Sequence, residues 1–502
     1  MDKLRIVCRA SKLSLVQAEI VKSKIFETHP EIEVSIEGIT SRGDRLPDQP
    51  LSTLGGIDFF TEDIYASLTS GQSDIAVHSL KDMSSEHFFS HDGFAVVSRD
   101  IPNDVLIANP SIIAKINSGE EILIGTSSPR REAMAIPFLR KALPKREKPI
   151  NINSKNIRGN VDTRLSKLHL GDQFDGIILA AAGINRLLNH TEFGVNIREI
   201  LSDKKIMILP LIECTPAPCQ GMIVAECHPE NKWVKQILSE INNIEYLNDA
   251  IGEKKLALQK GPGCSQKFGV TTIATRYSHH HFAFGENLQG EIIHEWTHLP
   301  KAQSGLKIFA TNTVMKDFFE YRWSQSSGVI DTKHAFVANP KIAQNIELIK
   351  NFQNRTIWAA GSKTWFDLAK TGIWVTGCTD GLGFESILPV LSMPLINGNI
   401  SNITILTHHK AAVKWLNKGI KALGFYDLIP KNDVEIIKSV EGADFIFWSS
   451  YAQYIHYHRF AISSVIHACA AGETAESLIH SGLHPVIFPT LKAFEIWRAH
   501  IR

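Results

Sequence analysis

Short apolar runs alternate with amphipathic stretches through the first half of this 502-residue chain. Parallel strands need long, usually helical connections, so this alternation predicts an α/β fold with mainly parallel pairing. The apolar runs have the length and composition of strands. We expect strands at Leu4–Arg9, Val34–Thr40, Asp74–Ser79, Phe94–Ser98, Val105–Asn109, Ile122–Ser127 and Gly176–Ala182.

The same pattern suggests where domains begin and end. Two α/β lobes fit the length, with a break at the turn residues of Asp100–Asp104 and a return near Pro216–Gly221. A smaller α+β unit follows from Asn243 to His298. Its expected elements are a helix at Glu253–Gln259 and a hairpin formed by Phe282–Phe284 and Glu291–Thr297.

The last 200 residues contain a near-repeat. Thr356–Ile373 and Val465–Leu483 both run from an apolar strand through a small-residue turn and a threonine into a helix that ends at glycine. His334–Ala338 and Asp444–Trp448 are a second matching pair of strands with polar turns. After a linker at Pro300–Gly305, the pattern therefore predicts two similar α/β lobes.

Composition excludes several classes of protein. The chain is 44% hydrophobic and 21% charged, with a formal net charge of +1, which argues against a disordered chain and against a dedicated nucleic-acid or membrane-surface binder. No signal-peptide pattern is visible, and the longest apolar stretch, Gly176–Ile184, is shorter than the about 18 residues that a membrane span needs. We expect a cytoplasmic protein with neither a membrane nor a nucleic-acid partner.

Basic residues stand where the predicted strands of the first half end. Ligands of open α/β sheets bind at the carboxyl ends of strands, close to helix N-termini. A single such cation is most simply a solvated surface charge, but a series in one structural position predicts a ligand with several carboxylates or phosphates. The series comprises Arg9, Lys81, Arg130, Arg131, Arg158 and Arg164.

Two other residues stand out from their surroundings. Asp82 is an acid among these cations: it is either a proton-transferring group that holds a cationic or N–H-bearing substrate, or a helix N-cap. Cys264 lies in a glycine–proline loop that begins at Gly261, whereas the other cysteines read as ordinary reduced thiols. The three histidines at His279–His281 are best explained as a solvated strand edge, so we expect no metal site.

Seven motifs follow one another from about residue 4 onward: Arg9–Ser11, Ser41–Asp44, Asp74–Asp82, Gly125–Arg131, Ile157–Arg164, Ala181–Arg186 and Gln220–Gly221. Together they resemble the porphobilinogen deaminase (hydroxymethylbilane synthase) family. The loop at Gly261–Cys264 is similar to that family's cofactor-attachment loop, which extends the resemblance to about residue 298. The last 200 residues more weakly resemble uroporphyrinogen-III synthase, a two-lobed family.

The resemblance implies two doubly wound lobes like those of periplasmic binding proteins, a small α+β domain and a bilobed α/β synthase-like region. It implies a monomer that joins four porphobilinogens into hydroxymethylbilane, with release of ammonia, and then closes this product to uroporphyrinogen III in tetrapyrrole (haem) biosynthesis. The implied domains are 1–97 with 220–240, 98–219, 243–302 and 303–502.

It also implies roles for individual residues. Dipyrromethane, the covalent cofactor, would be attached to Cys264, and Asp82 would be the catalytic residue that assists loss of the amino group. Thr364 and Thr474, at helix N-termini, would hold carboxylates in the C-terminal region. The cofactor would be bound by Lys81, Arg130, Arg131, Ser127 and Ser128, and the substrate by Arg9, Ser11, Arg158, Arg164 and Arg186.

The chain departs from the family pattern in a glycine loop, where Thr53 and Ile57 replace two lysines. Loss of these cations should weaken binding or slow elongation. Two alternatives stay open. One is an active deaminase with a non-catalytic C-terminal module. The other is a two-lobe binding protein for an anionic solute, which would give Cys264 no task.

Overall fold

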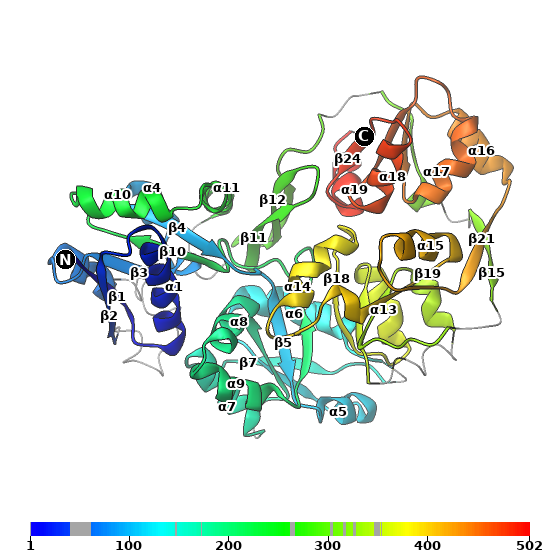
Figure 1. The fold of residues 1–502 in the computed structure, drawn as a ribbon. Coiled ribbons are helices and arrows are strands. Elements are labelled where there is room, and N and C mark those ends of the chain that lie inside the picture. The colour runs from blue at the N-terminus through cyan, green and yellow to red at the C-terminus, as the bar shows by residue number, and fades with distance from the viewer. Residues whose placement is uncertain are drawn as a thin grey trace. The chain divides into compact units, whose positions relative to one another are not determined.

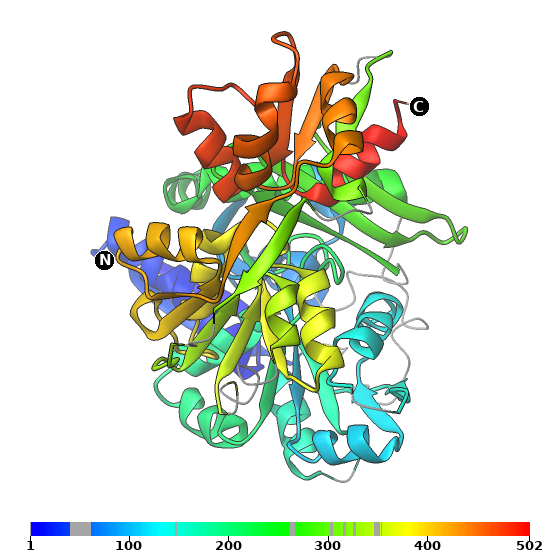
Figure 2. The same ribbon diagram turned by 90° about the vertical axis from the view of Figure 1, so that its right-hand side faces the viewer.

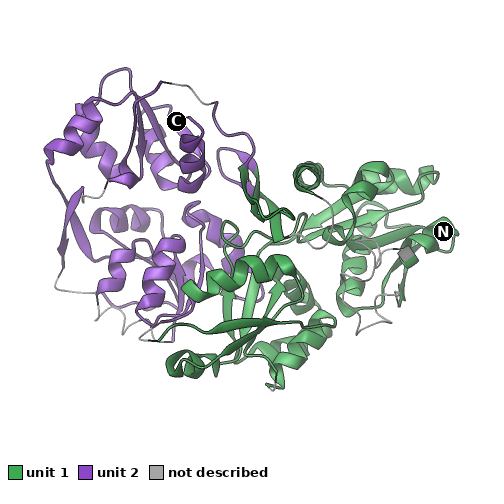
Figure 3. Ribbon diagram, turned by 180° about the vertical axis from the view of Figure 1, so that it is seen from behind, with its two compact units in different colours: residues 1–141, 147–272, 281–295 green, residues 142–146, 273–280, 296–502 purple. Residues whose placement is uncertain are grey.

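The structure is a computed structural model (Figure 1). It describes residues 2–40, 62–145, 148–171, 173–261, 267–301, 305–314, 318–324, 328–345, 352 and 354–501. Two compact units divide the chain (Figure 3): the first comprises residues 1–141, 147–272 and 281–295, and the second comprises residues 142–146, 273–280 and 296–502. Within the described ranges, no helix is both long and apolar enough to cross a membrane.

The first sheet has the strand order β2-β1-β3-β10-β4. Apolar residues of helices α1 and α10 pack on one face, and α3 contributes Ile64 and Leu68 to the other, so both faces are covered. The four strands predicted here are therefore confirmed in a sheet with helices on both faces, of which β2 is a mostly exposed edge strand. The elements are β1 (Lys3–Arg9), α1 (Lys12–Thr28), β2 (Glu33–Ile39), α3 (Glu62–Thr69), β3 (Ile75–Ser79), α4 (Ser85–Ser90), β4 (Phe94–Arg99), β10 (Met222–Glu226) and α10 (Lys232–Ile241).

The second sheet has the order β7-β6-β8-β5-β9. Its core strands are nearly free of polar side chains on either face, and β5 is buried along its whole length. Helices α6 and α8 begin at the carboxyl ends of β6 and β8. The elements are β5 (Asp104–Ala108), α5 (Ile112–Ser118), β6 (Ile122–Gly125), α6 (Pro129–Ala142), β7 (Ile152–Lys155), α7 (Val161–His169), β8 (Gly176–Ala180), α8 (Ala181–Asn189), α9 (Phe193–Leu201) and β9 (Lys205–Ile208).

Mainly parallel pairing was wrong for these two sheets, which are mixed. β10 runs antiparallel to both β3 and β4, and β5 runs antiparallel to both β8 and β9. The cause lies in the connections. β4 leads to β5, and β9 leads to β10, through segments without a helix that carry the chain from one sheet to the other. A strand buried on both faces reads as one apolar run in either direction, so the sequence pattern does not reveal its orientation.

A small three-stranded sheet of order β11-β12-β13 follows a long helix. The predicted hairpin is confirmed, its helix is longer than expected, and β11 was missed. β4 runs past the predicted limit at residue 97, and the domain limits remain predictions. The elements are α11 (Ile244–Lys260), β11 (Lys267–Ala274), β12 (His279–Glu286) and β13 (Ile292–Trp296).

The second unit contains two parallel sheets, of order β18-β17-β16-β19-β20 and β14-β22-β23-β24. An antiparallel ladder of β15 and β21 runs between them (Figure 2). The near-repeat is confirmed, because β16, β17, α13 and β18 match β22, β23, α18 and β24 in order and pairing. Two α/β lobes are therefore present, while their likeness to a synthase is not shown by this topology.

The elements of these lobes are β14 (Ile308–Ala310), β15 (Phe319–Trp323), β16 (His334–Val337), β17 (Thr356–Ala359), α13 (Ser362–Lys370), β18 (Val375–Cys378), α14 (Leu388–Ser392), β19 (Ile403–Thr407), α15 (His409–Asn417), β20 (Ala422–Gly424), β21 (Tyr426–Pro430), α16 (Val434–Glu441), β22 (Phe445–Trp448), α17 (Tyr451–Tyr457), β23 (Ile466–Ala470), α18 (Glu473–His480), β24 (Val486–Phe488) and α19 (Leu491–Ala499).

The core of the first sheet gives a direct test of this architecture. Ile6→Ala is expected to lower the free energy of unfolding by about 2–5 kcal/mol, because the fully buried side chain leaves a cavity. Ile292→Ala makes the same change at a side chain that is 73% exposed and should cost less than about 0.5 kcal/mol. Urea denaturation measures both variants, and equal losses would contradict the assigned core.

Candidate functional site

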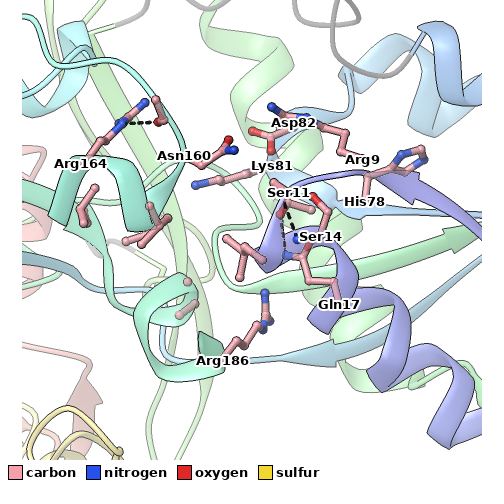
Figure 4. A pocket seen from close by; sticks show the side chains of 18 of the residues that line it. Arg9, Ser11, Ser14, Gln17, His78, Lys81, Asp82, Asn160, Arg164 and Arg186 are labelled. Carbon is pink, nitrogen blue, oxygen red and sulfur yellow. Dashed lines mark hydrogen bonds between the residues drawn. The ribbon is translucent and has the colours of Figure 1, made fainter. Parts of the chain in front are cut away.

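A cavity of about 560 Å³ lies at the carboxyl ends of the first unit's strands (Figure 4). Most of the site residues predicted from the sequence line it. Arg130 and Ser128 are not among its lining residues, and Cys264, Thr53 and Ile57 fall outside the described residues. The predicted residues that do line the cavity are Arg9, Ser11, Lys81, Asp82, Ser127, Arg131, Arg158, Arg164 and Arg186.

Local structure fixes several of these side chains. Ser11 is the N-cap of α1: its hydroxyl accepts a hydrogen bond from the Ser14 backbone N–H at 3.2 Å. The Ser127 hydroxyl donates to the carbonyl of Ile157 at 2.5 Å and accepts from the Ile157 N–H at 3.2 Å. This pair of bonds ties the turn after β6 to the turn after β7, where Arg158 begins the next basic segment.

Asp82 is not a helix N-cap. It is the last residue of a single 3₁₀ turn, Leu80–Asp82, which directly follows β3, and α4 is capped instead by Ser84. The Ser84 hydroxyl accepts from the His87 N–H at 3.1 Å. Of the two interpretations of Asp82 that the sequence left open, the capping one is therefore wrong, and Asp82 lines the cavity.

The cavity is strongly cationic. Desolvation lowers the pKa of Lys81, an effect that the carboxylate of Asp82 opposes and the guanidinium of Arg131 reinforces. Burial, together with repulsion from Arg131 and Arg158, lowers the pKa of Arg164 to about 10. Among the described lining residues, Asp82 is the one carboxylate. An anionic ligand would stabilise cations that are buried this close together.

Arg130 and Arg131 are held from behind by a buried carboxylate that sequence analysis missed. Asp104, 1% exposed, accepts a hydrogen bond from each guanidinium at 2.8 Å. Gln220 donates to the same carboxylate at 2.9 Å, and Arg130 donates its other terminal nitrogen to the Thr215 carbonyl at 2.7 Å. Arg130 therefore joins α6 to Asp104 and to Thr215, and it does not line the cavity. No motif in a single sequence marks Asp104, the first residue of a buried strand.

Arg186 contacts both of the segments that connect the two sheets. It is 6% exposed, donates to the carbonyl of Gly221, and lies 4.0 Å from a carboxylate oxygen of Asp100. Gly221 has a φ of +89°, and an added Cβ would lie 2.3 Å from the Asp100 carbonyl, so only glycine fits there. A cation that lines the cavity is thus hydrogen-bonded to a segment that connects the two sheets.

The second unit has a smaller cavity of about 230 Å³, lined in part by Arg276, Glu385 and Glu476. Arg276 lies 3.4 Å from Glu476. Thr364 and Thr474 do lie in the first turns of α13 and α18, as predicted, but neither lines this cavity, and Thr364 is only 4% exposed.

Comparison with known proteins identifies a family to which the sequence is similar. A family model described as porphobilinogen deaminase, dipyromethane cofactor binding domain, matches residues 4–236. A probable porphobilinogen deaminase of Saccharolobus islandicus (strain L.S.2.15 / Lassen #1) is 38% identical over 272 residues, covering 53% of this chain and 81% of that protein. The chain belongs to the porphobilinogen deaminase family.

A second member of the porphobilinogen deaminase family, from Thiobacillus denitrificans (strain ATCC 25259 / T1), is 34% identical over 271 residues, which cover 54% of this chain and 80% of that protein. Among solved structures, the substrate binding domain of a putative molybdenum ABC transporter from Clostridium difficile matches at a TM-score of 0.29 and 11% identity. That match covers 51% of this chain and 97% of the other. A TM-score this low does not establish a common fold. The deaminase family's matched domain is its dipyrromethane cofactor-binding domain.

The Asp104 pairing in this deaminase-family cavity has a measurable consequence. Asp104→Asn is expected to destabilise the protein by about 3–5 kcal/mol at pH 7, because two buried guanidiniums lose their carboxylate. Burial alone would raise the pKa of Asp104, but Arg130 and Arg131 hold it well below the unfolded value of about 3.9. The stabilisation is therefore complete above that value and is lost as the pH falls through the folded pKa.

Urea denaturation of both proteins at pH 7 and at successively lower pH below about 4 measures this effect. The difference between wild type and Asp104→Asn should shrink as the pH falls. Asp203→Asn removes an exposed carboxylate paired with Lys204 at 2.6 Å and should cost less than about 1 kcal/mol at pH 7. A small, pH-independent effect of Asp104→Asn would contradict the pairing.

Proposed function

We propose that this chain is a hydroxymethylbilane synthase, which joins four porphobilinogen molecules head to tail with loss of ammonia. The observation that carries the proposal is the cavity at the strand ends, where cations surround a single described carboxylate. Each substrate pyrrole bears an acetate and a propionate. A charge-assisted hydrogen bond to such a group contributes about 1.5–3 kcal/mol. The cations are Arg9, Lys81, Arg131, Arg158, Arg164 and Arg186.

The residues present fit the dipyrromethane cofactor of the family. Lys81 and Arg131 line the cavity and would hold the cofactor's carboxylates, while Cys264 lies in the segment between α11 and β11 and would be the attachment point. Ser127 also lines the cavity, but its hydroxyl hydrogen is donated to the Ile157 carbonyl, so it is not assigned to the cofactor. Arg130, whose terminal nitrogens contact Asp104 and Thr215, is not assigned to the cofactor. When bound, dipyrromethane supplies the pyrrole to which the first substrate is joined.

Asp82 would act on the only cationic part of the substrate. Its carboxylate can pair with the aminomethyl ammonium group while the surrounding arginines hold the acidic side chains, which orients the substrate. As ammonia leaves with the electron pair of the C–N bond, positive charge develops on the pyrrole, and a fixed carboxylate stabilises that charge. The remaining substrate-binding roles, for Arg9, Ser11, Arg158, Arg164 and Arg186, rest on their place around the same cavity.

Two variants test these roles separately. Asp82→Asn is expected to lower kcat for ammonia release from porphobilinogen by about 10²–10⁴-fold while the protein still carries its cofactor.

Cys264→Ser should lack the covalent mass of two pyrrole units, which intact-mass measurement should detect in wild type. Cys378→Ser changes a partly exposed cysteine elsewhere and should keep both the adduct and the activity.

Wild-type protein that is well folded but has neither adduct nor ammonia release would overturn the proposal. Binding of porphobilinogen without turnover would then favour the solute-binding alternative.

Cyclisation to uroporphyrinogen III is a second candidate, for the C-terminal region. The supporting observation is its two parallel-sheet lobes joined by the β15–β21 ladder, in which Gly383, after β18, lies close to Gly472, after β23. An added Cβ on Gly472 would lie 3.2 Å from the Cα of Gly383. The acidic residues Glu385 and Glu476 weigh against this role, since they disfavour a polycarboxylate in the nearby cavity.

The isomer of the product decides between cyclisation and a non-catalytic C-terminal module. If the region cyclises, porphobilinogen incubated with the whole chain and then oxidised yields type III uroporphyrin, and Arg276→Gln leaves ammonia release unchanged. A module without this activity yields only the type I isomer, because hydroxymethylbilane closes without inversion of its last ring. Chromatographic separation of the two isomers gives the result.

A further inference from the structure

A buried carboxylate in the first unit is bonded to histidines from two different elements. Glu226, the last residue of β10, is 1% exposed. Its Oε1 lies 2.6 Å from Nε2 of His78 on β3, and its Oε2 lies 2.8 Å from Nε2 of His87 on α4. We assigned no role to Glu226, His78 or His87 from the sequence.

The contacts fix the tautomer of His78. Burial alone would raise the pKa of Glu226, but the bonds from His78 and His87 lower it far below its usual range, so the carboxylate is ionised and only accepts hydrogen bonds. Nε2 of His78 must then carry the proton. In a neutral imidazole this leaves Nδ1 as a bare acceptor, the arrangement in which a carboxylate orients a histidine base.

That acceptor has no donor within the described part of the chain. Nδ1 of His78 is buried and makes no hydrogen bond there, although an unsatisfied buried polar atom costs about 1–3 kcal/mol. His78 lines the cationic cavity, and Figure 4 shows it beside Arg9. The other ionisable side chains described around that cavity are arginines and a lysine, so His78 and Asp82 are the two lining side chains that can act as bases.

Other titratable groups surround this pair without sharing its bonds. His91 stacks on His87 with ring centroids 5.2 Å apart, and burial lowers its pKa, but its Nε2 is 3.8 Å from Glu226. Tyr65 of α3 meets both of these rings edge-on. Further out are Cys227, whose thiol pKa is raised to about 11 by burial, and the ion pair of Asp92 with Lys235.

We propose that His78, positioned by Glu226, is a second proton acceptor of the cavity and takes the proton that the extended pyrrole loses during condensation. This inference rests on the proposed function. In that step the α-carbon of the pyrrole being extended forms a bond to the methylene carbon of the incoming unit, from which ammonia has departed. The α-carbon then releases its hydrogen as a proton to Nδ1, and the C–H electron pair restores the aromatic ring. The imidazolium is stabilised by Glu226 and returns the proton to water.

A deuterium-labelled substrate tests the step. His78→Gln is expected to lower kcat by about 100-fold, within the range for loss of a general base. It should also create a primary isotope effect with porphobilinogen deuterated at its free α-carbon, because proton removal becomes rate-limiting. Glu226→Gln should shift the acidic limb of the kcat–pH profile and reduce kcat by about tenfold, with KM unchanged. His91→Asn, a change at the neighbouring histidine whose Nε2 lies 3.8 Å from Glu226 and makes no hydrogen bond to it, should have no effect on kcat.

The tautomer provides a readout that does not depend on turnover. In ¹⁵N-labelled protein, long-range ¹H–¹⁵N spectra should assign the proton of His78 to Nε2 in wild type, and Glu226→Gln should redistribute it. Two results would overturn the inference: His78→Gln with unchanged kcat, or a slower variant that shows no isotope effect. If wild type itself releases no ammonia, the proposed function fails. If wild type releases ammonia and either of these two results is obtained, only the role of His78 fails.

Discussion

Asp104 is the residue on which the organisation of the first unit depends. Its carboxylate joins α6, through Arg130 and Arg131, to the start of β5 and to Gln220 in the returning segment. A buried carboxylate can remain charged only if its neighbours repay the cost of desolvation, and two guanidiniums at 2.8 Å do so. The same contacts fix Arg131 at the cavity wall, so one ion-pair network serves both the scaffold and the site.

Seven of the ten strands in the first two sheets could be predicted because they are short apolar runs, whereas β7, β9 and β10 were missed. The directions of the strands could not be predicted. β5 and β10 run antiparallel to their neighbours because the chain passes between sheets without a helix, and this choice leaves no mark on either strand's composition. The near-repeat of the last 200 residues was visible for the opposite reason, since each copy places its strand, turn and helix in the same local order.

Much of the cavity could be predicted from one rule, that basic residues directly after strands gather at a common sheet edge. Arg9, Lys81 and Arg158 follow it. The rule fails for Arg130, whose partner Asp104 lies 26 residues away, and it is silent about Glu226, which is 148 residues from His78. Partners at such separations are set by strand register, so only the folded chain brings them together.

The place of β10 has a consequence for synthesis of the chain. This strand lies between β3 and β4, yet it is translated after the whole second sheet. The nascent first sheet therefore lacks an interior strand, and the edges of β3 and β4 that pair with β10 stay unpaired until residue 226 has left the ribosome. Exposed strand edges of this kind favour aggregation during folding. The second unit has the same arrangement, because β14 pairs with β22, which is translated only after the whole sheet of the other lobe.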